Sequence, residues 1–168
     1  MVEPVRACVT DTNVWIDLHV AQIVEVAVTL PIVWHAPDIV LAELRQGLTG
    51  EALISLGVRS IELSATQLAE LTRLADVYRR PSVVDLSALV IARSLGATLL
   101  TGDHHLREAA EQEGIPIHGT LWLLDRLLEH RVMGPTALAA ALDQMLTAGR
   151  RLPRDQAEAR LTRWGGRV

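Results

Sequence analysis

The 168-residue sequence contains no lysine, and all sixteen of its basic side chains are arginine. Without lysine the chain cannot supply the amine for Schiff-base catalysis, and it cannot form a Walker-type phosphate loop. Cysteine is almost absent as well, because Cys8 is the only one. A single cysteine excludes an intramolecular disulfide, and its position within an apolar run predicts that it is buried.

Aromatic residues and long hydrophobic runs are also scarce. Phenylalanine is absent and aromatic content is 3%, so no cluster of base-stacking side chains is evident. An apolar stretch over residues 26–37 contains proline and histidine and is too short to span a bilayer. The first residues do not form a charged and then apolar leader with a cleavage site, so we expect a cytoplasmic location.

Charge is distributed unevenly along the chain. The net charge of −4 combines nine arginines against seventeen acids in residues 1–129 with seven arginines against three acids in residues 130–168. The first part is therefore at −8 and the tail at +4. A basic tail can contact nucleic acid or an acidic partner, although a solvated helical face explains the same pattern.

The composition is that of a globular protein, with 49% hydrophobic and 21% charged residues in a length that suits one domain. Between residues 82 and 117 the patterns of helix, strand, helix and strand follow one another, which is typical of an α/β fold with a parallel sheet. The patterns predict strands at 5–10, 32–34, 58–63, 97–101 and 115–117, and helices at 14–30, from 38 onward with Asp38 as its cap, 65–80, 85–95, 104–113, 119–131, 135–149 and 153–164.

Two of the predicted strands lead directly to an aspartate, Asp11 near the N-terminus and Asp103 after residues 97–102. In an open α/β sheet ligands bind beyond the carboxyl ends of the strands, so acids delivered there from distant segments can meet. Glu43, in a short helix, and Asp85, at a helix start, can join them. Four carboxylates in one crevice would repel one another unless a divalent cation such as Mg²⁺ or Mn²⁺ held them.

Each acid taken alone has a simpler interpretation. An aspartate at a strand end or a helix start commonly caps the helix or forms a turn, and Asp85 in particular fits that role. The joint pattern of four acids is what favours a metal site over four separate caps.

The order and local sequences of these acids resemble the PIN-domain nuclease family over residues 5–117. The motifs that carry the likeness are Asp11-Thr12-Asn13, Leu41-Ala42-Glu43-Leu44, the helix-opening Asp85, and Thr101-Gly102-Asp103. The resemblance implies a three-layer α/β/α fold around a central parallel sheet of four or five strands, with additional C-terminal helices. It also implies that single-stranded RNA is the substrate and that the chain belongs to a toxin–antitoxin pair.

Carried over by position, the resemblance implies that Asp11, Asp85 and Asp103 bind Mg²⁺ or Mn²⁺ and that Glu43 completes the catalytic acidic cluster. Asn13 and Thr101 would orient carboxylates or water. Catalysis would then be metal-assisted hydrolysis of a phosphodiester bond, which needs no nucleophilic side chain. Positive charge for the RNA backbone would come from arginines near the acidic segments, namely Arg45, Arg79, Arg80 and Arg107.

Two other acid-rich α/β families are excluded. Haloacid-dehalogenase phosphatases and response-regulator receiver domains both need a lysine, and the former also needs an acid where this chain has Asn13. The serious alternative is a PIN-like module that binds RNA or a protein without cleaving.

The tail resembles a PIN-like subgroup with a C-terminal helical extension. We therefore expect a nuclease domain over residues 1–130 and a helical extension over residues 131–168. The apolar helices of residues 119–149 exceed what a small core requires, which predicts a homodimer interface.

Overall fold

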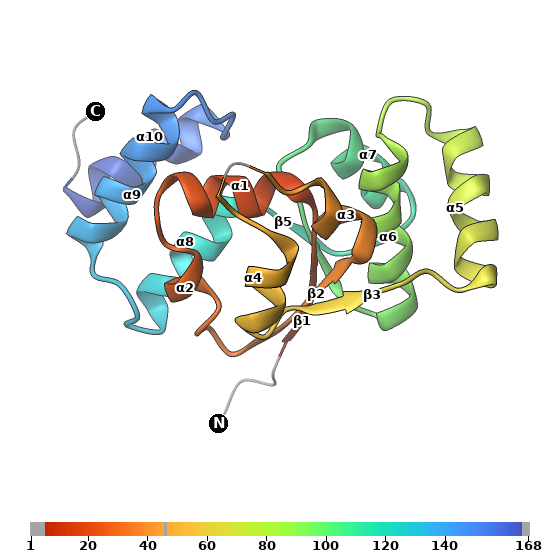
Figure 1. Ribbon diagram of the computed structural model, residues 1–168. Coiled ribbons are helices and arrows are strands. Elements are labelled where there is room, and N and C mark those ends of the chain that lie inside the picture. Colours follow the sequence, from red (N-terminus) through yellow and green to blue (C-terminus); the bar gives the residue numbers. More distant parts are fainter. Residues whose placement is uncertain (1–5, 46, 166–168) are drawn as a thin grey trace.

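The computed structural model describes residues 6–45 and 47–165. Its centre is a five-stranded parallel sheet with strand order β3-β2-β1-β4-β5, and helices cover both faces (Figure 1). The strands are β1 Arg6–Thr10, β2 Ile32–Pro37, β3 Arg59–Ile61, β4 Thr98–Leu100 and β5 Ile117–His118. The helices are α1 Thr12–Val20, α2 Val24–Ala27, α3 Asp38–Glu43, α4 Gly50–Ser55, α5 Ala65–Val77, α6 Val83–Leu95, α7 His104–Gln112, α8 Thr120–Glu129, α9 Pro135–Thr147 and α10 Arg154–Trp164.

The position of β1 in the sheet determines where a ligand can bind. β1 lies between β2 and β4, with Cys8 opposite Thr98 and Thr10 opposite Leu100. The chain builds β2 and β3 on one side of β1 and then crosses over to build β4 and β5 on the other side. The strand order therefore reverses between β1 and β4, and in such sheets ligands bind at the carboxyl ends of those two strands.

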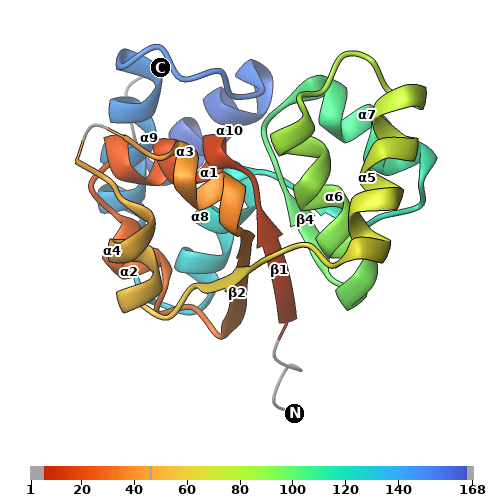
Figure 2. The same cartoon turned by 45° about the vertical axis from the view of Figure 1, so that its right-hand side comes forward.

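Each face of the sheet has its own hydrophobic core, because neighbouring strand residues point to opposite faces. Cys8 and Leu100 face one core, and Val9 and Leu99 face the other. Figures 1 and 2 show α5, α6 and α7 over one face and α1, α2 and α8 to α10 over the other. This arrangement confirms the predicted three-layer α/β/α fold.

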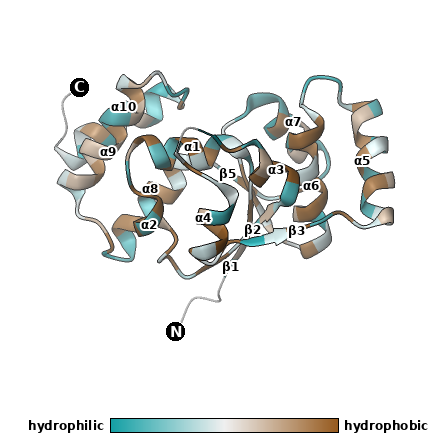
Figure 3. Cartoon of the chain, viewed as in Figure 1, coloured by the Kyte–Doolittle hydropathy of each residue, from teal (hydrophilic) through white to brown (hydrophobic). Residues whose placement is uncertain are grey.

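The edge strand β3 is more polar than the central strands. Arg59 and Ser60 are exposed, and β3 has a hydrophilic colour in Figure 3. A short and polar edge strand is unfavourable for pairing with another chain, so it protects this side of the sheet from aggregation.

The C-terminal helices pack within this chain. Trp15 of α1 belongs to the same core as apolar side chains from α8, α9 and α10. The burial of Leu124, Leu138 and Leu142 within this chain takes up apolar surface of residues 119–149, from which a dimer was expected. The homodimer and the division at residue 130 both stay predictions. The apolar side chains that suggested a dimer are buried by contacts within one chain.

Two local predictions about helices are wrong. The single helix expected over residues 14–30 is two helices, because Gln22 between them adopts a positive φ of 58°. Asp38 does not occupy the N-cap of α3, where Pro37 lies; it is the first helical residue, and its Oδ1 accepts a hydrogen bond from Ile39 N at 2.8 Å. Within the described ranges, no helix is both long and apolar enough to cross a membrane.

Candidate active site

Asp11 is the centre of the site. It follows β1, is fully buried, and its backbone N–H donates to the carbonyl of Leu100 at 3.1 Å. Its Oδ1 accepts a hydrogen bond from Val14 N at 3.0 Å and so caps α1, while its Oδ2 accepts one from Thr101 Oγ1. Both carboxylate oxygens are therefore held in fixed positions at the end of β1.

Thr101 connects Asp11 to Asp103. Its Oγ1 accepts a hydrogen bond from Asp103 N at 3.0 Å while donating to Asp11. Asp103 then caps α7, because its Oδ1 accepts from Leu106 N at 2.8 Å. One buried hydroxyl thus joins two acids that are far apart in the sequence.

Asp85 and Glu43 approach the same centre from other elements. Asp85 Oδ2 accepts from the backbone N of Ser82 at 3.1 Å and from its Oγ at 2.8 Å, which places Asp85 in the capping box of α6. The charge of Asp85 contributes to raising the pKa of Asp11. Glu43, exposed at the end of α3, accepts a hydrogen bond at 2.7 Å from the hydroxyl of Thr12, the residue after Asp11.

Three of the four acids cap helices, so the simpler interpretation of each acid is also true. Asp11, Asp85 and Asp103 stand at the N-termini of α1, α6 and α7. Helix N-termini favour negative charge, which helps to keep carboxylates close together. Within the part of the chain that the structure describes, Asp85 Oδ1 and Asp103 Oδ2 accept no hydrogen bond. Capping therefore leaves an oxygen on each of these two acids for another partner.

The buried carboxylate of Asp11 forms no ion pair with any residue that the structure describes. Burial is the main cause that raises its pKa, to about 7 in all; the charges of Asp85 and Asp17 also raise this pKa, and the hydrogen bonds from Thr101 and Val14 lower it. A carboxylate that is this hard to ionise needs a positive partner to stay charged at neutral pH. The chemistry of the site thus fits an oxygen-ligated divalent cation.

Glu43, Asp85 and Asp103 do not form, with Asp11, a complete set of ligands for one metal ion in this structure. Among residues 6–45 and 47–165, no three acid, histidine or cysteine side chains lie close enough together to hold one metal ion. Cation binding would therefore require one or more of the acids to change rotamer. Asp85 and Asp103, each with an oxygen not used in capping, are the ones placed to do so.

The raised pKa of Asp11 leads to a prediction for the metal-free protein. Between about pH 4 and pH 7 the folded state holds a proton on Asp11 that the unfolded state has lost, so this residue lowers the free energy of unfolding as pH rises. Asparagine does not titrate, so we expect Asp11→Asn to remove this fall in the free energy of unfolding. The substitution should therefore stabilise the protein more at pH 8 than at pH 5. Urea unfolding in EDTA at both values measures the difference, and an equal effect at both would contradict it.

Asp17 is a further acid in this region that sequence reasoning did not select. It is buried in α1, where its Oδ2 accepts from Thr120 Oγ1 at 2.6 Å and its Oδ1 from Arg150 Nε at 2.5 Å. Arg150 Nη2 also reaches Asn13 Oδ1 at 3.3 Å. Asn13 and Asp17 are four residues apart and so share one face of the helix, which is the signal that the sequence carried.

Of the four predicted RNA-binding arginines, Arg107 is the one whose side chain hydrogen-bonds to a residue of the site in the described part of the chain. Its Nη1 lies 3.4 Å from the carbonyl oxygen of Thr101. Arg79 donates to the Asp76 carbonyl at 3.2 Å and, with Arg80, lines a separate cavity of about 170 Å³ beside α7.

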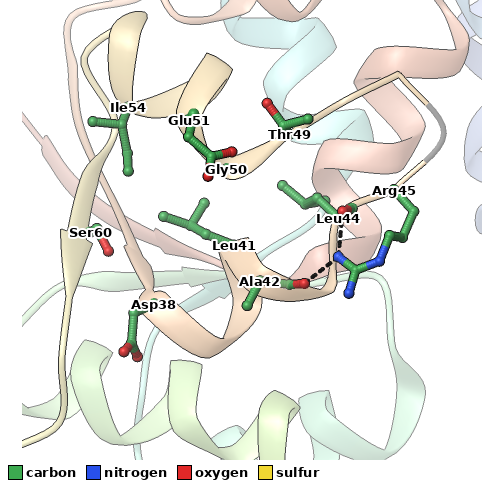
Figure 4. Close-up of a pocket in the computed structure, with 10 residues that line it drawn as sticks. All are labelled: Asp38, Leu41, Ala42, Leu44, Arg45, Thr49, Gly50, Glu51, Ile54 and Ser60. Atoms are coloured by element: carbon green, nitrogen blue, oxygen red, sulfur yellow. Dashed lines mark hydrogen bonds between the residues drawn. The ribbon is translucent and has the colours of Figure 1, made fainter.

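Arg45 lies at a cavity of about 530 Å³ between α3 and α4 (Figure 4). Its guanidinium donates to the carbonyls of Ala42 and Leu44, so it satisfies the C-terminal end of α3. None of Asp11, Asp85 and Asp103 lines this cavity. Its size therefore does not mark the site.

Comparison with known families gives a match over most of the chain. The sequence model of a family described as "PIN domain" matches residues 7–166. The chain belongs to the PIN-domain family. The match extends through α10, so it includes the C-terminal helices as well as the sheet. PIN domains are in general nucleases and usually use divalent metals. No curated protein matches the chain.

Proposed function

We propose that this PIN domain is a divalent-metal-dependent endoribonuclease that hydrolyses phosphodiester bonds of single-stranded RNA with Mg²⁺ or Mn²⁺. The observation that carries the proposal is the buried carboxylate of Asp11, which lies where the strand order of the sheet reverses between β1 and β4. Thr101 joins it to Asp103, and the charge of Asp85 acts on it. A buried carboxylate charge at this position destabilises the fold unless a bound ligand neutralises it. A divalent cation is the ligand that carboxylate oxygens bind best.

Asp11, Asp85 and Asp103 would hold the metal, and Glu43 would complete the acidic cluster. When bound, the metal would supply a water with a lowered pKa and neutralise charge on the phosphate. Thr101 fixes the orientation of the Asp11 carboxylate through its hydroxyl. Asn13 is held by Arg150, so its side chain stays beside the end of β1.

Covalent catalysis by cysteine is disfavoured in this fold. Cys8 is fully buried in β1, and burial raises the pKa of its thiol to about 12. The thiolate needed for nucleophilic attack is therefore not populated at neutral pH. Hydrolysis by a metal-activated water needs no nucleophilic side chain, and the burial of Cys8 is consistent with it.

The test of the proposal is the cleavage of a single-stranded RNA by the purified chain. Cleavage should occur with Mg²⁺ or Mn²⁺ and stop when EDTA removes the cation. Absence of cleavage of single-stranded RNA of mixed sequence with either cation would contradict the proposal.

Metal binding can be tested without any activity. We expect Mn²⁺ at about a hundred times its Kd to raise the Tm of the parent by about 5–10 °C, because binding to the folded state alone adds about 2.7 kcal/mol. Asp11→Asn should lose most of that rise. Differential scanning calorimetry measures both, with the exposed Asp143→Asn as a control that keeps the full shift. An equal shift in Asp11→Asn would place the cation elsewhere.

The second candidate function is a PIN-like module that binds RNA or a protein without cleaving it. It is favoured by the separation of the acids, since the described residues contain no group of three that could hold an ion. RNA binding that persists in EDTA, with no cleavage under either cation, would identify this function.

We also propose that the chain acts as the toxin of a toxin–antitoxin pair, with a cognate antitoxin as its partner. The support is membership in the PIN-domain family. Growth arrest on expression of the parent, relieved by a small neighbouring reading frame and absent for Asp11→Asn, would support it. Normal growth with active enzyme would contradict it.

A further inference from the structure

Two cavities meet beside Asp103. One, of about 290 Å³, extends from Asp103 toward α1 and Arg150, and the other, of about 240 Å³, extends from the end of β4 toward Trp122 of α8. Gly102 and Arg151 line both of them. We call the combined space the arginine cleft. A Cβ placed on Gly102 would meet no atom within 4 Å, so this peptide faces open space next to the candidate site.

The outer wall of the arginine cleft is the loop between α9 and α10. Arg150 fixes this loop to α1, because its Nε binds Asp17 Oδ1 at 2.5 Å and its Nη2 lies 3.3 Å from Asn13 Oδ1. Figure 1 shows α9 and α10 on the α1 side of the sheet. The C-terminal extension therefore builds one side of a cleft that begins at the acids.

Two of the four arginines in the cleft are free to bind a ligand. Arg150 is paired with Asp17, and Arg160 makes two bonds to Asp125, at 3.0 and 2.6 Å. Arg107 and Arg151 make no ion pair with any described residue. Both line the second cavity, and Arg151 also lines the first cavity together with Asp103, so unpaired positive charge lies in the same cleft as Asp103.

A flat aromatic wall accompanies these charges. The rings of His118 and Trp122 stack in parallel, with 4.4 Å between their centroids, and both line the second cavity. Burial lowers the pKa of His118, and the charges of Arg6, Arg126 and Arg107 lower it further, so the ring is neutral at pH 7. Arg6 and Arg126 lie over the Trp122 ring, 5.6 and 5.5 Å from its centroid, so of this pair His118 is the ring placed to stack on a base. Stacking on an aromatic ring within a positively charged groove is how proteins bind single-stranded nucleic acid.

We propose that the arginine cleft binds the nucleotide of single-stranded RNA next to the scissile phosphate, with Arg107 and Arg151 contacting its backbone phosphate. The inference rests on the proposed ribonuclease function, and it assigns a binding role to the C-terminal extension. Attraction to these two arginines offsets the repulsion between RNA phosphates and the acids. The two cavities together fall within the roughly 300–1,000 Å³ of sites that enclose a small ligand, which suits one nucleotide rather than a duplex.

The test measures RNA binding in EDTA, so that neither metal nor cleavage contributes. The probe is a short fluorescein-labelled single-stranded RNA of mixed sequence, followed by fluorescence anisotropy over a range of salt concentrations. Arg151→Gln and Arg107→Gln should each weaken binding roughly tenfold and reduce the salt slope by about 0.7, the value for one lost phosphate contact on a single strand. Arg151→Glu should weaken it more.

Arg163→Gln is the matched control. Arg163 is an exposed arginine of α10 that lines neither cavity, so its replacement removes the same charge from the same extension. The control should bind like the parent. If it binds as weakly as Arg151→Gln, attraction is diffuse and the cleft is not the binding site.

The outcomes separate this inference from the proposed function. If the cleft variants bind RNA as well as the parent does, and the parent cleaves RNA, the cleft is not the RNA-binding site but the ribonuclease function is supported. Weakened binding in those variants, with no cleavage by the parent under either cation, would support the cleft and overturn the ribonuclease. A parent that does not bind RNA would overturn the cleft.

Discussion

Replacing Asp11 or Asp103 with asparagine is expected to reduce RNA cleavage at least about a hundredfold, because even outer partners of a metal site are worth ten- to a hundredfold. Asparagine is nearly the same size as aspartate and is an equally good helix cap, so α1 and α7 should keep their N-termini. The fold should therefore survive while the negative charge is lost. Cleavage of a labelled single-stranded RNA with Mn²⁺ in excess measures the effect.

The control for this experiment is Asp143→Asn, which removes an exposed acid of α9 away from the site. It should cleave RNA at the rate of the parent. Circular dichroism of each variant checks that the fold is retained. Equal cleavage by the parent, Asp11→Asn and Asp103→Asn would refute the assignment of these acids.

Replacing Arg150 with alanine is expected to destabilise the protein by about 3 kcal/mol, because it leaves the charge of Asp17 buried without its cation. The side chain of Asp17 is only 4% exposed, and Thr120 would be its one remaining partner in the described chain. For a chain of this length the loss corresponds to a Tm lower by about 6–12 °C. Thermal and urea unfolding measure it.

Three comparisons test the cause of that loss. Arg154→Ala breaks the exposed pair with Glu158 and should cost less than about 1 kcal/mol. Adding Asp17→Asn to Arg150→Ala should recover part of the stability, since the buried charge is then gone. Burial already raises the pKa of Asp17, so the loss should be smaller at pH 5 than at pH 8. A loss as large in the double variant as in Arg150→Ala would show that packing, not charge, was removed.

Most of the fold could be predicted because its signals are local. The helices predicted over residues 65–80 and 85–95 are found as α5 and α6, with Ser64 in a capping box before α5 and Gly96 in the left-handed conformation at the C-cap of α6. Dependence on local signals also explains why the single helix predicted over residues 14–30 was wrong. Apolar spacing continues through the segment, and nothing in it marks the positive φ at Gln22 that separates α1 from α2.

Some residues of the candidate site could also be predicted from local sequence, and others could not. Asp11 and Asp103 stand out because each comes directly after an apolar strand, and the residues after parallel strands lie together at one edge of the sheet. The partnership of Asp17 and Arg150 could not be foreseen, because 133 residues separate them. The same holds for Arg151, whose place in the cleft depends on how the loop after α9 packs against α1.

By itself the sequence determined the chemistry that this protein can offer: acids at the ends of predicted strands, arginine as its only strong cation, no lysine, and a single cysteine within an apolar run. Those features come from residue type and short-range pattern. Tertiary structure alone decided which charges are neutralised and which remain free, leaving Arg107 and Arg151 unpaired in the described chain while Arg150 and Arg160 are paired. The physical reason is that ion pairing depends on separations of a few ångströms, which only the packing of distant segments sets.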